Sequence, residues 1–369
     1  MDKRSKEVDI AKAICIILVV MGHASCPFRE WIYLFHVAMF FWLSGYLFNY
    51  NREPFKIVYK TMRSLYIWYV LANTLYVIFH NYFFRLGFYT FETNILNGVY
   101  NGYRSPYVLS ESLYDIKVII VQILKGLLFH SKEQFMWPSW FIKTLILIEL
   151  WIVFIKLLKL YNHITNMVLC VVCLGIGYLG PQILPIIPDT IWICASCGSI
   201  FFAGSLCKYL NIIEKISNLN MLIQIILAVI NILFLITMLK YGNIELSQNR
   251  FVNPLFLIVA SSAGIIMIMC TSSIIYKVTN KKCRIIEQLL VFIGQNTLPV
   301  LFGHLLCFKL ITIVIINVYS LPESMKAAFF TLVNKQNYFW WIIYSLDGVI
   351  LPLVVLYFFK KTQQKEMIK

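Results

Sequence analysis

Charged residues are what this sequence most clearly lacks. Only 13% of its 369 residues are Asp, Glu, Lys or Arg, whereas soluble domains contain about 25%. A soluble fold of this length would need far more charged surface, and 60% hydrophobic residues indicate an integral membrane protein instead. Glycine and proline are also sparse within the recurring apolar segments, whose helical length favours a bundle of helices over a β-barrel of alternating strands.

Motifs of the common soluble enzymes are missing as well. No HExxH, P-loop or GxSxG pattern occurs, which excludes most of the soluble-enzyme repertoire. Cysteine is not scarce, but the ten cysteines fall mostly inside apolar segments, where two CxxC spacings occur without a histidine partner. We interpret Cys170, Cys173, Cys194 and Cys197 as small packing residues and expect neither a metal site nor a disulfide framework.

The formal net charge of +15 has two interpretations. In a soluble protein it would suggest nucleic-acid binding, but here Lys and Arg flank apolar segments, as the positive-inside rule expects. We therefore expect the lipid bilayer as a partner and no nucleic acid. The N-terminal MDKRSKEVDI and the apolar run after it could mimic a signal peptide, but no small-x-small cleavage site follows, which favours a retained first span.

About ten apolar segments have the length of a membrane span. With the N-terminus in the cytoplasm, most basic residues fall in cytoplasmic loops and tails, so both termini are predicted to be cytoplasmic. The predicted fold class is an all-α polytopic membrane protein, a bundle of about ten transmembrane helices in one domain over 1–369, in the plasma or inner cell membrane. Two segments, 115–130 and 283–296, are amphipathic and are expected to form helices at the membrane interface, with re-entry into the membrane as the alternative for 115–130. The predicted spans are 10–24, 31–48, 65–84, 140–158, 166–184, 191–210, 220–239, 254–276, 297–319 and 340–359.

Lys12 and His23 lie in one apolar stretch, eleven residues apart. Eleven residues rotate a helix by about 1,100°, roughly 20° beyond three turns, so the two side chains share one face and are separated by about 16 Å. Asp9 lies within about 40° of His23 on the same face. A charged side chain inside a membrane span is expensive, which marks this face as a candidate functional site.

A second histidine, His36, follows early in the next predicted span. The loop between the two spans is short, so His36 and His23 are predicted to lie at a similar depth. Neutral imidazole accepts a hydroxyl proton near pH 7, which makes both residues candidate catalytic bases. The alternative for each is a buried histidine satisfied by a backbone carbonyl or a hydroxyl.

Lys60 and Arg63 follow the second span at its predicted cytoplasmic end. They are three residues apart and hence on one helix face, where they could hold phosphate groups or form an ordinary basic flank. Glu149, His304 and Asp347 lie within predicted spans. Each could line a cavity or link helices through hydrogen bonds, and we treat them as second-tier site candidates.

Several stretches together resemble the acyltransferase family 3 membrane proteins, and within that family the fucose 4-O-acetylase type. The most specific is DIAKAICIILVVMGHASCPFREWIYLFHVAMFFWLSGYLF, residues 9–48, in which a basic residue precedes a histidine by eleven positions. WPSWFIKTL, residues 137–145, is similar to the family's Trp-Phe segment. GQNTLPVLFGH, residues 294–304, is similar to its late segment that ends in histidine.

The resemblance implies transfer of an acyl group, usually acetyl, from acetyl-CoA to a hydroxyl of a carbohydrate, in a polysaccharide or a lipid-linked oligosaccharide. By motif position the family's essential histidine is His23 and its basic partner is Lys12, with Asp9 and His36 as further catalytic candidates. Its cytoplasmic Arg-x-x-Arg appears as Lys60-Thr-Met-Arg63, which keeps the charge but lacks one guanidinium fork. Acetyl-CoA is the expected co-substrate, bound by Lys12, Lys60 and Arg63. His23 would act as general base or as a transient acyl carrier.

Two other function classes fit part of the pattern. Ionisable residues within spans also suit a proton-coupled transporter that exports a glycan or a small metabolite. However, the internal repeats that are common in transporters are not evident in this sequence. A purely structural membrane scaffold would leave Lys12 and His23 unexplained.

Overall fold

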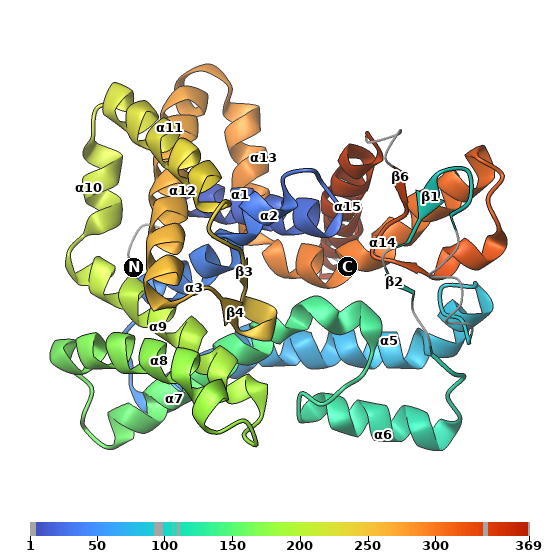
Figure 1. The fold of residues 1–369 in the computed structure, drawn as a ribbon, viewed down its shortest axis with the longest axis horizontal. Coiled ribbons are helices and arrows are strands. Elements are labelled where there is room, and N and C mark those ends of the chain that lie inside the picture. Colours follow the sequence, from blue (N-terminus) through green and yellow to red (C-terminus); the bar gives the residue numbers. More distant parts are fainter. Residues whose placement is uncertain (1–4, 92–98, 106, 109–110, 335–338, 368–369) are drawn as a thin grey trace. The chain divides into compact units, whose positions relative to one another are not determined.

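The computed structural model describes residues 5–91, 99–105, 107–108, 111–334 and 339–367 (Figure 1). Contacts divide the chain into two compact units, which it enters alternately. Unit 1 contains Met1–Val19, Glu30–Tyr66 and Trp140–Gln295, and unit 2 contains Val20–Arg29, Ile67–Ser139 and Asn296–Lys369. The first helix, α1 (Lys6–His23), begins in unit 1 and ends in unit 2.

Unit 1 is built mainly of helices. Three of them begin at an asparagine, Asn162, Asn220 or Asn253, whose side chain accepts a backbone N–H of the first turn, as N-cap residues do. In chain order the elements are α2 (Arg29–Tyr33), α3 (His36–Leu47), α4 (Pro54–Thr61), the π-helical turn η1 (Met62–Tyr66), α7 (Trp140–Leu157), α8 (His163–Ile183), α9 (Asp189–Tyr209), α10 (Ile212–Asn218), α11 (Met221–Met238), β3 (Ile244–Glu245), the 3-10 turn η4 (Leu246–Gln248), β4 (Arg250–Phe251), α12 (Pro254–Lys282) and α13 (Arg284–Gln295).

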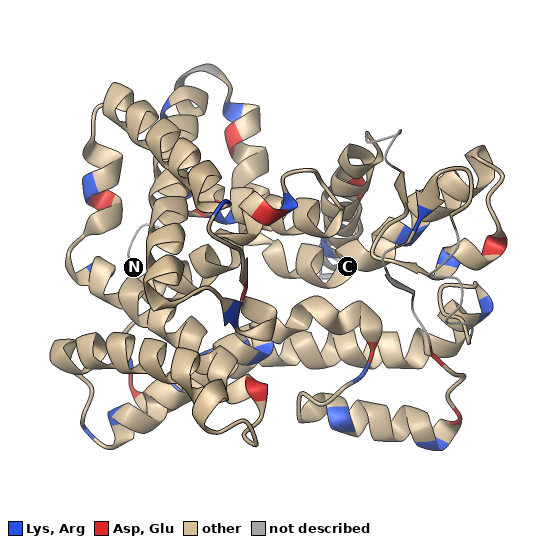
Figure 2. Cartoon of the chain, viewed as in Figure 1, with Lys and Arg blue, Asp and Glu red and all other residues tan. Residues whose placement is uncertain are grey.

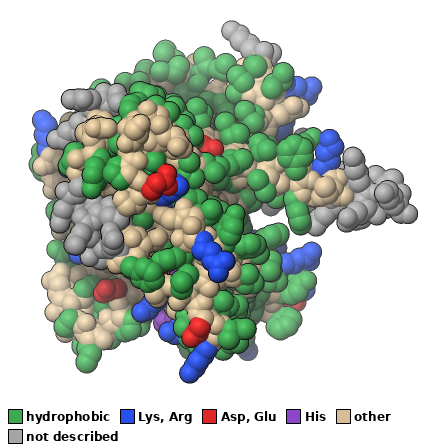
Figure 3. All heavy atoms as spheres, turned by 90° about the vertical axis from the view of Figure 1, so that its right-hand side faces the viewer, with side chains coloured by type: hydrophobic (Ala, Val, Ile, Leu, Met, Phe, Trp, Pro, Cys, Tyr) green, Lys and Arg blue, Asp and Glu red, His purple; other side chains and the backbone are tan. Residues whose placement is uncertain are grey.

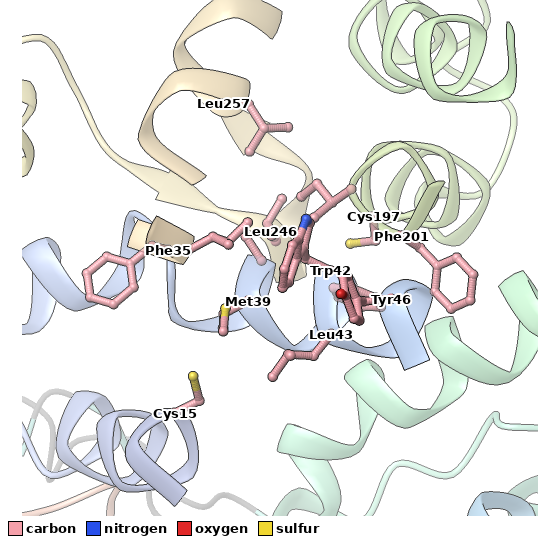
Figure 4. Close-up of a cluster of buried hydrophobic side chains, with 14 of the residues drawn as sticks. Cys15, Phe35, Met39, Trp42, Leu43, Tyr46, Cys197, Phe201, Leu246 and Leu257 are labelled. Carbon is pink, nitrogen blue, oxygen red and sulfur yellow. The ribbon is translucent and has the colours of Figure 1, made fainter. Parts of the chain in front are cut away.

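Helices α3 and α9 approach closely in the centre of unit 1. A Cβ atom on Gly45 would lie 1.8 Å from the carbonyl oxygen of Phe201, and one on Gly204 would lie 2.0 Å from that of Trp42. Around this crossing, buried side chains from α1, α3, α9 and α12 form one hydrophobic core, which includes Cys15 and Trp42 (Figure 4). In an apolar environment such close packing, rather than transfer of apolar groups out of water, holds helices together.

Unit 2 combines helices with two short antiparallel strand pairs. Strand β1 (Tyr103–Arg104) pairs with β6 (Val333–Asn334), and β2 (Tyr107–Val108) pairs with β5 (Ala328–Phe329). Two segments that are far apart in the sequence therefore run alongside each other. The remaining elements are α5 (Ile67–Arg85), α6 (Ile116–Leu127), the 3-10 turn η3 (Gln134–Ser139), α14 (Thr297–Val318), the 3-10 turn η5 (Glu323–Ala327) and α15 (Trp340–Met367).

Six of the helices in the described ranges are long and apolar enough to cross a membrane, namely α8, α9, α11, α12, α14 and α15. Few charged residues lie along them (Figure 2). Helices α1 and α7 coincide with predicted spans but carry more charge, for example Asp9 and Lys12 in α1 and Lys143 and Glu149 in α7. The structure confirms a mainly helical protein with several candidate spans. The count of ten and the side on which the termini lie stay predictions.

The second predicted span, 31–48, is not one helix. The chain leaves helical geometry at Leu34 and Phe35, so that α2 ends at Tyr33 and α3 begins at His36. The two segments predicted to be interfacial, 115–130 and 283–296, do form helices, α6 and α13. Whether they lie at the membrane interface stays a prediction.

Large hydrophobic side chains are exposed on several helices. On α6, Ile116, Ile120 and Leu124 are each more than half exposed. Figure 3 shows hydrophobic side chains over much of the face in view, with charged residues scattered among them. An apolar surface of this kind is an aggregation hazard in water, and contact with lipid acyl chains removes that hazard.

Candidate active site

The imidazole rings of His23 and His304 contact each other in unit 2. His23 is the last residue of α1, and His304 lies in α14. His23 Nδ1 and His304 Nε2 are 2.8 Å apart, and the two rings are nearly parallel, with an interplanar angle of 5°. His304 is fully buried, whereas His23 is only half-buried. The pair therefore has one inner ring and one outer ring that a ligand can reach.

The hydrogen bonds of this pair determine which nitrogen of each ring carries the proton. His304 Nδ1 lies 2.9 Å from the carbonyl oxygen of Val300, which can only accept, so Nδ1 donates and Nε2 of the neutral ring is an acceptor. His23 Nδ1 must then donate to His304 Nε2, which leaves the lone pair of neutral His23 on Nε2. The geometry thus assigns His23 Nε2 as the basic and nucleophilic atom of the pair.

A second parallel ring contacts His23. The ring of Phe330 lies 5.0 Å from the imidazole, at an interplanar angle of 8°. The preceding residue, Phe329, stacks on Trp137 at 5.6 Å, and Trp137 is 48% exposed. Because parallel aromatic contacts resist tilting of a ring, Phe330 restricts the orientations open to His23.

Helix α15 comes close to His304 because Gly348 has no side chain. A Cβ atom at this position would lie 2.7 Å from Phe308 Cε1 and 3.2 Å from His304 Cβ. The neighbouring Asp347, a second-tier candidate, has a buried carboxylate oxygen, Oδ2, with no hydrogen-bond partner among the residues that the structure describes. Because a buried acceptor without a partner is costly, Asp347 keeps its place as a candidate for binding a polar group of a ligand.

Asp9, near the other end of α1, is held within unit 1 by the segment GQNTLPVLFGH. Its Oδ2 atom accepts a hydrogen bond from Gln295 Nε2 at 2.9 Å, and the residue is 1% exposed. Gly294 packs against its backbone, since a Cβ atom there would lie 1.8 Å from the Asp9 carbonyl oxygen. In unit 2 the same segment supplies His304 to His23. The segment thus contacts the first helix near both ends.

The candidate phosphate-binding residues belong to unit 1. Lys60 lies in α4 and Arg63 in η1, and both are exposed. Arg63 Nη1 is 3.4 Å from the hydroxyl of Tyr59. A π-helical turn widens a helix, and such turns are frequent at functional sites. Glu149 accepts a hydrogen bond from Thr61, next to Lys60, and so links α7 to α4.

A separate histidine cluster lies elsewhere in unit 2. His80 Nδ1 is 3.0 Å from a carboxylate oxygen of Glu133, and His80 Nε2 is 3.0 Å from the carbonyl oxygen of Ser112. The side chains of His80 and Glu133 are both 1% exposed. The hydroxyl of Tyr89 donates to Glu133. Burial of the hydroxyl, and to a lesser degree the negative charge of Glu133, raise the pKa of Tyr89 well above its usual range. Across the described ranges no three His, Cys, Asp or Glu side chains gather as metal ligands.

The comparison with known families decides between the function classes that the sequence left open. Residues 5–359 match the family model described as an acyltransferase domain, in its family 3 form. The protein belongs to the acyltransferase 3 family. This match covers nearly the whole chain and includes His23, His304 and Asp347. No curated protein and no solved structure matches the chain.

In this acyltransferase the predicted site residues are grouped differently from the sequence prediction. The sequence grouped His23 with His36, but the ring that contacts His23 is that of His304, which was only a second-tier candidate. His36 lies in unit 1 and is buried, with Nδ1 2.8 Å from the carbonyl oxygen of Ile32. That contact is the one expected of a structural histidine. Catalytic roles for His36 and Asp9, and a donor-binding role for the half-buried Lys12, stay predictions.

Sequence reasoning missed Phe330, whose ring contacts that of His23. Phe330 follows a two-residue strand, which has no recognisable periodicity. Lys309 is visible in the sequence as a charge inside an apolar span, but its partners lie in a segment that follows α14. Only the fold shows that Lys309 contacts the loop that carries Phe330.

Proposed function

We propose that this acyltransferase is an O-acetyltransferase that moves an acetyl group from acetyl-CoA to a sugar hydroxyl, with His23 as the general base. The hydrogen bond between His23 Nδ1 and His304 Nε2, 2.8 Å long, carries the proposal. It fixes the tautomer of His23 and so leaves a lone pair on Nε2, the atom that must accept the hydroxyl proton. Membership of an acyltransferase family favours this function over a transporter or a scaffold.

In the proposed reaction His23 first takes up one proton from the sugar hydroxyl and later gives one proton to the leaving thiolate. His23 Nε2 takes the proton of the sugar hydroxyl while the hydroxyl oxygen attacks the thioester carbonyl carbon. The resulting tetrahedral intermediate collapses, the carbon–sulfur bond breaks, and the CoA thiolate takes the proton from the His23 imidazolium. Throughout, the Val300 carbonyl keeps His304 Nε2 as an acceptor, so that the hydrogen bond to His23 Nδ1 strengthens as His23 becomes positively charged.

The same lone pair also supports a two-step route. His23 Nε2 would attack the thioester directly, release CoA and carry the acetyl group until the sugar hydroxyl displaces it. Initial-rate kinetics separate the routes, because a two-step reaction with an acetylated enzyme gives parallel lines in double-reciprocal plots. Intersecting lines indicate direct transfer between two bound substrates.

Lys60 and Arg63 are the proposed sites for the phosphate groups of acetyl-CoA. Both side chains are exposed in unit 1, and cationic side chains bind phosphate through charge-assisted hydrogen bonds. Lys12, on the same helix as His23, is proposed to assist donor binding. The proposed acceptor is a surface or extracellular polysaccharide, or its lipid-linked oligosaccharide precursor, at the cell membrane. The apolar helices support a position in the bilayer.

The proposal is tested with radiolabelled acetyl-CoA and membranes that contain the protein. We expect label to enter carbohydrate in the wild type and the His23→Ala variant to lose this incorporation about 100-fold to 10,000-fold, the usual contribution of a general base. His163→Ala is the matched control, because His163 is an exposed histidine of α8 in unit 1. Near-normal incorporation by a well-expressed His23→Ala variant would exclude His23 as the base.

A further inference from the structure

Lys309 is a charged side chain buried in the apolar helix α14. It is 1% exposed, and no carboxylate of the described residues forms an ion pair with it. Its Nζ atom donates to two backbone carbonyl oxygens, that of Lys326 at 2.9 Å and that of Ala328 at 2.7 Å. The rings of Phe88 and Phe135 lie 5.7 Å and 5.9 Å from Nζ, within cation–π range.

The two carbonyl groups belong to a segment, residues 326–332, that is also attached to the end of α1. Thr331 Oγ1 and Ser25 Oγ are 2.8 Å apart and share a hydrogen bond. Ser25 follows His23 by two residues and has a left-handed backbone conformation, with φ of 59°. The 326–332 segment is therefore fixed to α14 through Lys309 and to the residues after His23 through Thr331.

Phe330 lies in this segment between the two attachment points. Its ring is parallel to that of His23 at 5.0 Å. A histidine side chain rotates in a broad well about its Cβ–Cγ bond, so the direction of Nε2 depends on what touches the ring. The hydrogen bond to His304 holds Nδ1, and Phe330 restricts the tilt of the imidazole plane.

We propose that Lys309 is a positioning residue for His23: by holding the carbonyl groups of Lys326 and Ala328, it keeps Phe330 flat against the imidazole. Without the ammonium group, the 326–332 segment loses two hydrogen bonds and Phe330 moves away from His23. The imidazole then becomes more accessible and Nε2 is no longer held in one direction. The consequence for catalysis rests on the proposed function, whereas the position of the ring does not.

Lys156 offers a matched control in unit 1. Its Nζ atom also donates to two backbone carbonyl oxygens, those of Tyr50 and Arg52, the second at 2.7 Å. Lys156→Met removes the same kind of contact as Lys309→Met. An effect common to both variants would report a general consequence of losing such a contact, and an effect confined to Lys309→Met would report the 326–332 segment.

Modification of histidines by diethyl pyrocarbonate, read by peptide mass spectrometry, measures the accessibility of each imidazole in the full-length protein in detergent micelles. We expect Lys309→Met and Phe330→Leu each to raise the modification rate of His23 by roughly threefold or more, as local opening does. Lys156→Met should leave that rate unchanged. His80, which is 1% exposed, should stay unmodified in every folded variant and so reports on the integrity of unit 2.

Several outcomes would overturn the proposal. A wild-type His23 rate in Lys309→Met with His80 still protected would show that the ammonium does not hold Phe330 in place. A wild-type rate in Phe330→Leu would show that Phe330 does not cover the ring. Modification of His80 in Lys309→Met would assign Lys309 to the folding of unit 2 as a whole, which contradicts a local role.

Activity distinguishes this proposal from the proposed function. In membranes that receive radiolabelled acetyl-CoA, Lys309→Met should lower kcat roughly tenfold or more while the KM for acetyl-CoA stays near the wild-type value, since ring orientation acts on the chemical step. Retained acetyl transfer in His23→Ala refutes the proposed function, but it does not affect the diethyl pyrocarbonate result for the position of the His23 ring. If Lys309→Met leaves the diethyl pyrocarbonate modification of His23 unchanged while His23→Ala is fully inactive, only the positioning role of Lys309 is refuted.

Discussion

Unit 2 contains two histidine clusters of opposite character. At His80 both ring nitrogens face an acceptor, the Glu133 carboxylate and the Ser112 carbonyl, and the ring lies 3.5 Å from that of Tyr114. At His23 the neighbouring histidine contacts Nδ1, the ring is half-buried, and the partner His304 is itself oriented by a backbone carbonyl.

The two clusters differ in whether a nitrogen of the histidine ring can take up a proton from a ligand. In the His80 cluster the carbonyl of Ser112 keeps Nε2 protonated, and the proton between Nδ1 and Glu133 is enclosed by protein on all sides. In the His23 cluster the neutral pair leaves a lone pair on the outer ring. The two clusters therefore differ in one property that bears on the proposed function. The neutral ring of His23 has an acceptor nitrogen, Nε2, on a partly exposed side chain, whereas both nitrogens of His80 face acceptors inside the protein.

The largest expected effect in this comparison is on stability. His80→Ala leaves the buried Glu133 carboxylate with the Tyr89 hydroxyl but without its ion-pair partner, which should cost about 3–5 kcal/mol of unfolding free energy. Thermal unfolding in detergent, followed by intrinsic fluorescence, measures the loss, and acetyl transfer per folded molecule should be retained. Unchanged thermal stability together with lost activity would place His80 in the chemistry and remove the contrast between the clusters.

A smaller effect is expected at His304, the partner of the proposed catalytic base. His304→Ala removes the acceptor for His23 Nδ1–H, and the loss of an orienting partner should lower kcat about 10-fold to 100-fold. His304→Gln retains a carbonyl acceptor and should keep more activity than the alanine variant. Equal rates for the wild type and His304→Ala would show that the hydrogen bond does not orient His23.

The smallest effect concerns His36, whose backbone contact resembles that of a structural histidine. His36→Gln removes the contact with the Ile32 carbonyl and should cost about 0.5–1.5 kcal/mol of stability, with acetyl transfer close to the wild-type rate. The same unfolding and transfer assays measure both quantities. A loss of transfer as large as that of His23→Ala would instead support the catalytic role predicted from the sequence.

The first helix was largely predictable from local sequence. The eleven-residue spacing of Lys12 and His23 needs only helical geometry, and α1 extends over both residues. The helices α6 and α13 were predictable from their amphipathic patterns for the same reason. The segment 294–304 was singled out by resemblance, and the structure shows its contacts with Asp9 and His23.

The remaining features depend on contacts between distant parts of the chain. His23 and His304 are separated by 281 residues, so no local pattern pairs them. The 326–332 segment owes its conformation to Lys309, Ser25 and a strand partner near residue 107. The break between α2 and α3 carries no proline or glycine, and hydrophobic periodicity alone therefore predicted one continuous span.

Nitrogen NMR of histidine in the full-length protein tests the assignment of the His23 proton most directly. The chain has six histidines, so selective labelling gives few signals, and the His23→Ala variant assigns the one from His23. At neutral pH we predict the chemical shift of a protonated nitrogen for His23 Nδ1 and of an unprotonated nitrogen for His23 Nε2, with His80 Nε2 protonated as the internal contrast. A proton on His23 Nε2 in the neutral ring would contradict its assignment as the base.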